Sequence, residues 1–142
     1  MANRSINHLG SVETIKLPVS QSVTIEQGDL VAVNSTGNAI LCTDAASIKF
    51  VGVNTRGKVD NSTGANGDKF VYADNYAVFS TMAFSGSVTN ASLGVSVYAT
   101  SNSKLVSIAT GSNSIKVGTL VSLPLGVTSS TTGSVALGRA SI

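Results

Sequence analysis

Turn-forming residues interrupt this sequence about every ten residues, and short runs of β-branched and apolar residues lie between them. Val95, Val97 and Ala99 occupy alternate positions, and segment 115–123 repeats the pattern. Such runs predict strands with one buried face, and no segment shows a sustained helical period. We therefore expect an all-β fold, a compact antiparallel β-barrel or sandwich, with at most one helical turn at residues 44–47.

The N-terminal segment differs from the rest of the chain. Residues 1–18 are polar and mixed, and they end at Pro18. We expect an extended N-terminal arm or edge segment here, either disordered or docked on a neighbour. Residues 19–142 then form a single β-barrel-like domain, as the length of 142 residues suggests.

Two stretches are rich in turn-forming residues. Segment 60–68 consists almost wholly of them, and its Asn66-Gly67 pair predicts a primed hairpin turn because both residues tolerate positive φ. The polar segment 129–132 predicts a longer turn before the final strand, which Val135 and Leu137 mark.

A weak internal repeat relates the two halves of the chain. Gly-Asp-Leu-Val at 28–31 and Gly-Val-Ser-Val at 94–97 each open a hairpin. The segments that follow the two hairpins are Ser-Ile-Lys-Phe-Val-Gly at 47–52 and Ser-Ile-Lys-Val-Gly at 114–118. They match when a one-residue gap is allowed. The repeat indicates either a duplicated β unit or chance similarity within a chain rich in Gly, Ser and Val.

Composition narrows the classes of function. Charged residues make up 11% of the chain, and the mean hydropathy of +0.30 favours a subunit whose neutral surface is covered in an assembly. The net charge is only +2, and no Lys/Arg cluster indicates nucleic-acid binding. Cys42 is the only cysteine, which fits a reducing compartment. We expect neither a signal peptide nor a membrane-spanning segment, because no apolar run is long enough.

The sequence offers little for catalysis or cofactor binding. Residues 52–58 match the first seven positions of a phosphate-binding P-loop, but Val59 replaces the Ser or Thr that coordinates magnesium. His8 is the sole histidine and lies in the N-terminal segment, so zinc sites built from His and Cys are excluded. Segment 60–64 vaguely resembles a calcium loop but lacks most of the ligands. We expect no enzyme activity, no catalytic residue, no metal and no cofactor.

The order of these elements resembles a family, the bacteriophage capsid cement or decoration proteins of the small, β-tulip-like barrel kind. The resemblance covers about residues 20–142. The segments that carry it are Gly-Asp-Leu-Val at 28–31, Phe-Val-Gly-Val at 50–53, the glycine-rich turn at 64–67, Gly-Val-Ser-Val-Tyr at 94–98, Lys-Val-Gly at 116–118 and Gly-Ser-Val-Ala-Leu at 133–137.

The resemblance implies a structural virion protein, made in the host cytoplasm, on the exterior of an icosahedral capsid. Such proteins bind the major capsid protein, usually as homotrimers at local three-fold positions, and link neighbouring capsomers. The residues that we expect to contact the capsid come from the N-terminal segment and from the densest basic stretch: Arg4, Ile6, His8, Lys16, Lys49, Arg56 and Lys58. The alternative for the basic stretch is a solvated strand edge, where lysine discourages aggregation.

Two other classes of function remain as alternatives. A glycan- or receptor-binding module, such as a head-fibre or adhesin domain, would also be rich in β-structure, and such sites usually present aromatic platforms. Only three Tyr and four Phe are available, and we expect most of them in the core because they lie on strands. A small hydrolase would require a cluster of polar side chains, of which the sequence shows no sign.

Overall fold

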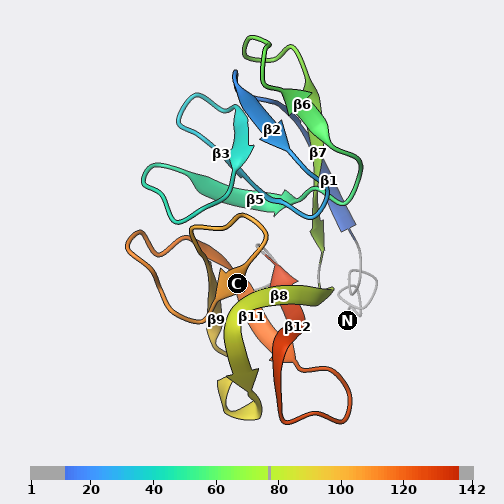
Figure 1. Cartoon of the computed structure of the whole chain (residues 1–142), viewed down its shortest axis with the longest axis vertical. Coiled ribbons are helices and arrows are strands. Elements are labelled where there is room, and N and C mark those ends of the chain that lie inside the picture. The colour runs from blue at the N-terminus through green and yellow to red at the C-terminus, as the bar shows by residue number, and fades with distance from the viewer. Residues whose placement is uncertain (1–11, 77, 138–142) are drawn as a thin grey trace, which may run out of the picture.

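The structure, a computed structural model, describes residues 12–76 and 78–137. It confirms the all-β fold with antiparallel sheets and a closed barrel (Figure 1). The first unit contains β1 (Val12–Pro18), β2 (Val23–Ile25), β3 (Leu30–Val33), β4 (Ala39–Leu41), β5 (Lys49–Val53), β6 (Val59–Asn61) and β7 (Phe70–Tyr76). The second unit contains β8 (Phe79–Thr89), the short 3-10 helix η2 (Asn90–Ser92), β9 (Ser96–Ala99), β10 (Val106–Ser107), β11 (Lys116–Ser122) and β12 (Ser129–Leu137).

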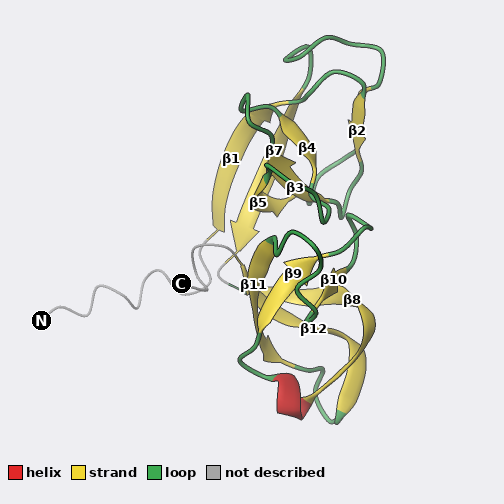
Figure 2. Cartoon of the chain, turned by 90° about the vertical axis from the view of Figure 1, so that its left-hand side faces the viewer, coloured by secondary structure: helices red, strands yellow, loops and turns green. Residues whose placement is uncertain are grey.

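The two units share one strand order. The first sheet runs β1-β7-β5-β3-β4, and the second runs β8-β12-β11-β9-β10 and closes into a barrel through a parallel contact between β10 and β8. An isolated parallel bridge between Val19 and Ala39 links the corresponding ends of the first sheet. Figure 2 shows the units one above the other, and Figure 1 shows the separate β2–β6 pair on the first.

The repeat extends to individual backbone contacts, which favours a duplicated β unit over chance similarity. Gly28 and Gly94 have φ angles of 92° and 88°, a region open to glycine at little cost. The Gly28 N–H donates to the Asn54 carbonyl at 2.7 Å, and the Gly94 N–H donates to the Leu120 carbonyl at 2.8 Å. The matching glycines in the sequence therefore make the same turn in both units.

A second pair of glycines explains the Val-Gly ends of the repeat. Gly52 lies where β5 passes β7, and Gly118 lies where β11 passes β12. A Cβ atom at either position would overlap a backbone carbonyl, that of Asp74 or that of Ala136. Close strand approach therefore requires glycine at both sites.

One hydrophobic cluster joins the two units. The first unit has a core of its own, formed by Val19, Ile25, Val31, Ala39, Val71 and Ala73. The second unit's core also includes four residues of the first, namely Leu30, Ala32, Cys42 and Val53. Because successive residues of a strand face opposite sides, β3 contributes Val31 to one core and its neighbours to the other. Within the described residues, no helix is long or apolar enough to cross a membrane.

The expected arm is in part a strand. Residues 12–18 form β1, which pairs antiparallel with β7 along its whole length, from Val12 opposite Tyr76 to Pro18 opposite Phe70. β1 lies at the edge of its sheet, so this stretch is the expected edge segment rather than a disordered arm, and β7 supplies its hydrogen-bond partners. The rest of the proposed arm, residues 1–11, lies outside the described residues.

Two local predictions are wrong, and at residues 44–47 the expected upper limit of one helical turn is not reached. Of the Asn66-Gly67 pair only Gly67 has a positive φ, 82°, and the turn joins β6 to β7, which do not pair with each other. Residues 129–132 belong to β12 rather than to a turn, because they pair with β8. Residues 44–47 form a bend and a turn with no helix, and the Asp44 carboxylate accepts the backbone N–H groups of Ser112 and Asn113.

Candidate interaction surface on the first unit

The pairing of β1 with β7 places large side chains on the outside of the first unit. Val71 and Ala73 of β7 face the core and are buried. Phe70 and Tyr72, at the alternate positions, lie on the opposite face and are 48% and 38% exposed. The register sets Lys16 of β1 opposite Tyr72 on this face.

Two cations lie over these rings. The Lys16 Nζ is 4.7 Å from the centroid of the Phe70 ring and 5.9 Å from that of Tyr72. The Arg56 Cζ lies 4.8 Å from the Tyr72 centroid. Both distances to Tyr72 and the one to Phe70 fall within the range of cation–π attraction. We call Lys16, Arg56, Phe70 and Tyr72 the aromatic–cationic face.

A buried carboxylate lies beside this face. Asp74 is 4% exposed and accepts hydrogen bonds from the Thr14 hydroxyl at 2.6 Å and the Thr55 hydroxyl at 2.5 Å. The Arg56 Nη2 lies 3.6 Å from its Oδ1. Because Arg56 is half exposed, this ion pair contributes little to stability, but it directs the guanidinium toward Tyr72.

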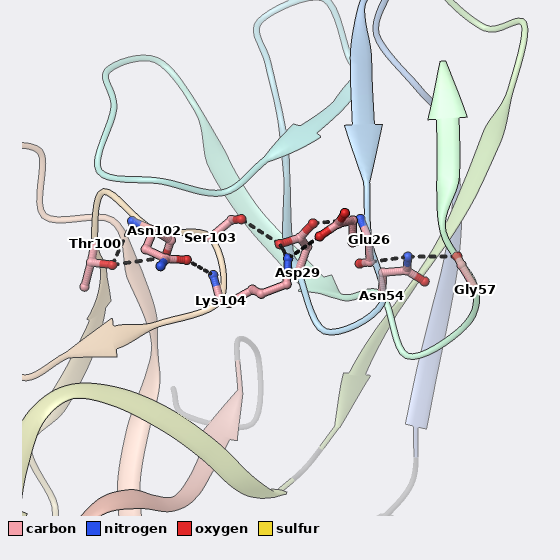
Figure 3. Close-up of polar contacts among 8 residues, drawn as sticks. All are labelled: Glu26, Asp29, Asn54, Gly57, Thr100, Asn102, Ser103 and Lys104. Atoms are coloured by element: carbon pink, nitrogen blue, oxygen red, sulfur yellow. Dashed lines mark hydrogen bonds and ion pairs between the residues drawn. The ribbon is translucent and has the colours of Figure 1, made fainter. Parts of the chain in front are cut away.

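Asn54 shapes the turn that presents Arg56. Its side-chain amide donates to the carbonyls of Glu26 and Gly57, both at 3.2 Å (Figure 3). Its Oδ1 accepts the Arg56 N–H at 3.0 Å. All of these bonds involve backbone groups, so they fix the path of the chain after β5. The position of Arg56 is therefore set by a buried amide as well as by Asp74.

The same region has an open strand edge. β1 is the last strand of its sheet and, in the described part of the chain, its only strand partner is β7. The other edge of β1 presents backbone N–H and C=O groups that a partner strand can pair with. Lys16 on such a strand also discourages indiscriminate edge-to-edge pairing.

The structure brings together two of the predicted contact residues, Lys16 and Arg56. Lys58 is nearby in sequence but lies in the connection to β6, where it has a minor effect on Asp60. Hydrogen bonds from Ser62, followed by one from Thr24, lower the pKa of Asp60 to about 2.

The remaining predicted contacts lie elsewhere. Lys49 begins β5, at the opposite end of that strand from Arg56, and borders a shallow hollow of about 470 Å³ beside the β3–β4 turn. Arg4, Ile6 and His8 lie outside the described residues. The predicted set is thus divided, and only Lys16 and Arg56 belong to one surface.

The two aromatic residues of this surface are not among the contact residues predicted from the sequence. Strand aromatics were expected in the core, and that expectation is wrong for Phe70 and Tyr72. The signal was present, because Val71 and Ala73 alternate with them and can fill the inner face. The sequence alone did not show which face the larger side chains occupy.

A second polar cluster joins the two units. Asp29 is 2% exposed, and its carboxylate accepts the Glu26 N–H at 2.7 Å, the Ser103 hydroxyl at 2.6 Å and the Lys104 ammonium at 3.0 Å (Figure 3). Lys104 also donates to the Glu26 carboxylate at 2.8 Å. Hydrogen bonds to Glu26 and then to Asp29 raise the pKa of Lys104. The lysine therefore stays protonated, and the cluster acts as a connection between the units.

The other candidate residues are unsuited to catalysis, to metal binding or to phosphate binding. Burial raises the pKa of the Cys42 thiol to about 12, so it is not a nucleophile at neutral pH. In the part of the chain that the structure describes, no three His, Cys, Asp or Glu residues gather to hold a metal. The P-loop-like segment 52–58 leads into strand β6, so no helix N-terminus follows to bind a phosphate.

Comparisons with protein-family models, with curated proteins and with solved structures find no match to this chain.

Proposed function

We propose that this chain is a non-catalytic structural protein of a phage virion. In this proposal it binds the major capsid protein on the outside of an icosahedral shell, as a homotrimer at local three-fold positions, and links neighbouring capsomers. The observation that supports binding to a protein surface is the aromatic–cationic face, which presents two aromatic rings and two cations on paired strands.

The chemistry of this face suits a protein partner. Tyr and Arg are enriched among the residues that dominate binding energy at interfaces. Here Tyr72 lies on a strand paired on both sides, and Arg56 is oriented by Asp74 and Asn54. Little side-chain order would have to be gained on binding, which lowers the entropic cost. The two cations favour a partner surface that carries carboxylates.

The glycan-binding alternative receives less support from the same residues. A sugar ring would have to stack on Phe70 or Tyr72. Lys16 and Arg56 already lie over those rings, so stacking would require both cations to move. A carboxylate-bearing protein surface could instead meet the cations where they are.

Co-sedimentation with empty shells, assembled from the major capsid protein of the phage that encodes the chain, tests the proposal. We expect the wild-type protein to pellet with the shells and Arg56→Glu to remain largely in the supernatant, because the substitution reverses a charge at the centre of the face. Lys49→Glu makes the same change of charge outside the face and should pellet as wild type.

Two results would overturn the proposal. Wild-type protein that stays in the supernatant at saturating shell concentration would exclude capsid binding. Equal loss of binding for Arg56→Glu and Lys49→Glu would show that general charge, rather than the aromatic–cationic face, governs attachment.

A further inference from the structure

The register of β1 against β7 determines which backbone groups of β1 lie on its open side. The Val19 N–H donates to the Lys69 carbonyl at 2.9 Å, one residue beyond the paired strands. Along antiparallel strands, residues bonded to the partner strand alternate with residues whose backbone groups point away from it. Odd-numbered residues of β1 therefore bond to β7, and the even-numbered Thr14 and Lys16 present their N–H and C=O groups on the open side.

Two neighbouring residues agree with this alternation. Pro18 has no N–H, and an outward-facing position on an edge strand is where a sheet tolerates proline. The Ser20 N–H donates away from β7, to the Ala39 carbonyl of β4 at 3.0 Å. In the described part of the first unit, a single bridge at Val19 joins this side of β1 to β4. Figure 2 shows β1 on the outside of the unit, with no described strand beyond it.

The side chains on the two faces of β1 specify the kind of strand that complements its edge. Lys16 lies on the outer face, over Phe70 and beside Tyr72. Ile15 and Leu17 alternate with it on the inner face and are half-buried. Neighbouring strands lie about 4.8 Å apart, so the side chains of an added strand would lie directly beside these residues. A segment that alternates acidic and apolar residues would set carboxylates beside Lys16 and apolar groups beside the inner face.

We infer that the partner of this surface docks as an extended segment of alternating acidic and apolar residues, which adds a strand to the open side of β1. The inference deepens the proposed function and rests on it, because it names the part of the partner that meets the aromatic–cationic face. Main-chain hydrogen bonds to Thr14 and Lys16 hold the segment, and its carboxylates select it through Lys16.

A second copy of this chain is less suited to the same edge. Glu13, the acidic residue of β1, lies on the opposite face of the strand from Lys16 because side chains alternate along it. Two copies paired through β1 would therefore set no carboxylate of either strand beside Lys16. The charge pattern of the edge favours a different chain as the partner.

Nuclear magnetic resonance titration of the isotope-labelled full chain with two peptides tests the inference without shells. The test peptide has about eight residues, a common strand length, and alternates Glu with Val. The control peptide has Lys in place of every Glu. We expect the acidic peptide to shift the backbone amide signals of Thr14 and Lys16 saturably and to slow their hydrogen exchange, and the basic peptide to leave them unchanged. An acidic peptide that leaves both amides unaffected would overturn the inference.

A matched pair of variants at Thr14 separates strand addition from other effects. Both Thr14→Pro and Thr14→Val lose the hydroxyl bond to Asp74, but only the proline variant loses the outward N–H. Thr14→Pro should bind the acidic peptide about tenfold more weakly than Thr14→Val. Equal affinities of two folded variants would contradict strand addition.

A charge reversal provides a test that does not depend on the folding of the proline variant. Lys16→Glu keeps every backbone donor and acceptor of β1, and it should bind the basic peptide in preference to the acidic one. An unchanged preference for the acidic peptide would show that Lys16 does not select the segment.

Co-sedimentation with shells decides the capsid proposal separately. Wild-type protein that binds the acidic peptide but stays in the supernatant would support strand addition and exclude the capsid as the partner. Wild-type protein that pellets with shells but does not bind the peptide would keep the capsid proposal and overturn strand addition.

Discussion

The two units have the same strand order but differ in what fills equivalent positions. Asp29, Asn54 and Asp74 are buried in the first unit, and their counterparts in the second are Val95, Leu120 and Ala136. The backbone contacts around these positions are conserved between the units, as the bonds of Gly28 and Gly94 illustrate. The comparison shows that backbone pairing specifies this topology, while the side chains inside it are free to build either a polar network or an apolar core.

One face of β3 and the corresponding face of β9 differ in the opposite sense: here the first unit is apolar and buried, and the second is more polar and less buried. Leu30 and Ala32 of β3 are buried against the second unit. Their counterparts in β9, Ser96 and Tyr98, are only partly buried. The first unit therefore has an apolar face that docks on the second, and the second lacks a similar face. This difference explains why the first unit docks on the second through β3, whereas the second unit has no matching apolar face on β9.

Replacing Leu120 by Asn, the residue at the corresponding position of the first unit, should have the largest effect on stability. Leu120→Asn removes a fully buried leucine and places an amide among apolar neighbours, so we expect a loss of about 4 kcal/mol in the free energy of unfolding. Urea denaturation followed by circular dichroism measures the change. A loss below about 1 kcal/mol would mean that the second unit can accommodate the polar pattern of the first.

Replacing Asp29 by Val, the residue at the corresponding position of the second unit, should have an intermediate effect on stability. Asp29→Val removes the acceptor for Ser103 and Lys104, and we expect a loss of about 2 kcal/mol because the partly buried Glu26 N–H and Ser103 hydroxyl lose their partner. The reaction of Cys42 with a thiol reagent at pH 8 should accelerate, since this residue is buried between the units. Unchanged Cys42 reactivity would indicate that apolar packing alone holds the units together.

Lowering the pH should have the smallest effect on stability, and it should act on the first unit. The folded-state pKa of Asp60 is lowered from 3.8 to about 2. Its contribution to stability is therefore present above pH 4 and is lost as the pH falls through about 2. Asp60→Asn should flatten the dependence of the urea midpoint on pH in this window. An identical pH profile for Asp60→Asn and wild type would contradict this assignment.

Much of the fold follows from local patterns in the sequence. The alternation of apolar residues predicts strands, and the glycines at 28 and 94 mark the same turn in both units. Local patterns failed at residues 12–18 and 129–132, where polar sequences form β1 and β12. Both strands obtain their hydrogen bonds from distant partners, β7 and β8, which no local window contains.

The candidate surface needed more than the sequence. The basic residues Lys16 and Arg56 could be named from the sequence, but they are forty positions apart. The register of β1 against β7 places Lys16 beside Tyr72, and contacts with Asn54 and Asp74 place Arg56 there.

By itself, then, the sequence determined the all-β class, because period-two alternation and frequent turns allow no other regular structure. It suggested the duplication but left chance similarity open, and the matching glycine conformations and close strand approaches of the structure favoured a duplicated unit. The tertiary structure decided which strands pair, which faces are buried and which charges meet. Those outcomes depend on burial and hydrogen bonding between segments far apart in the chain. The same local sequence patterns are compatible with several ways of pairing these segments.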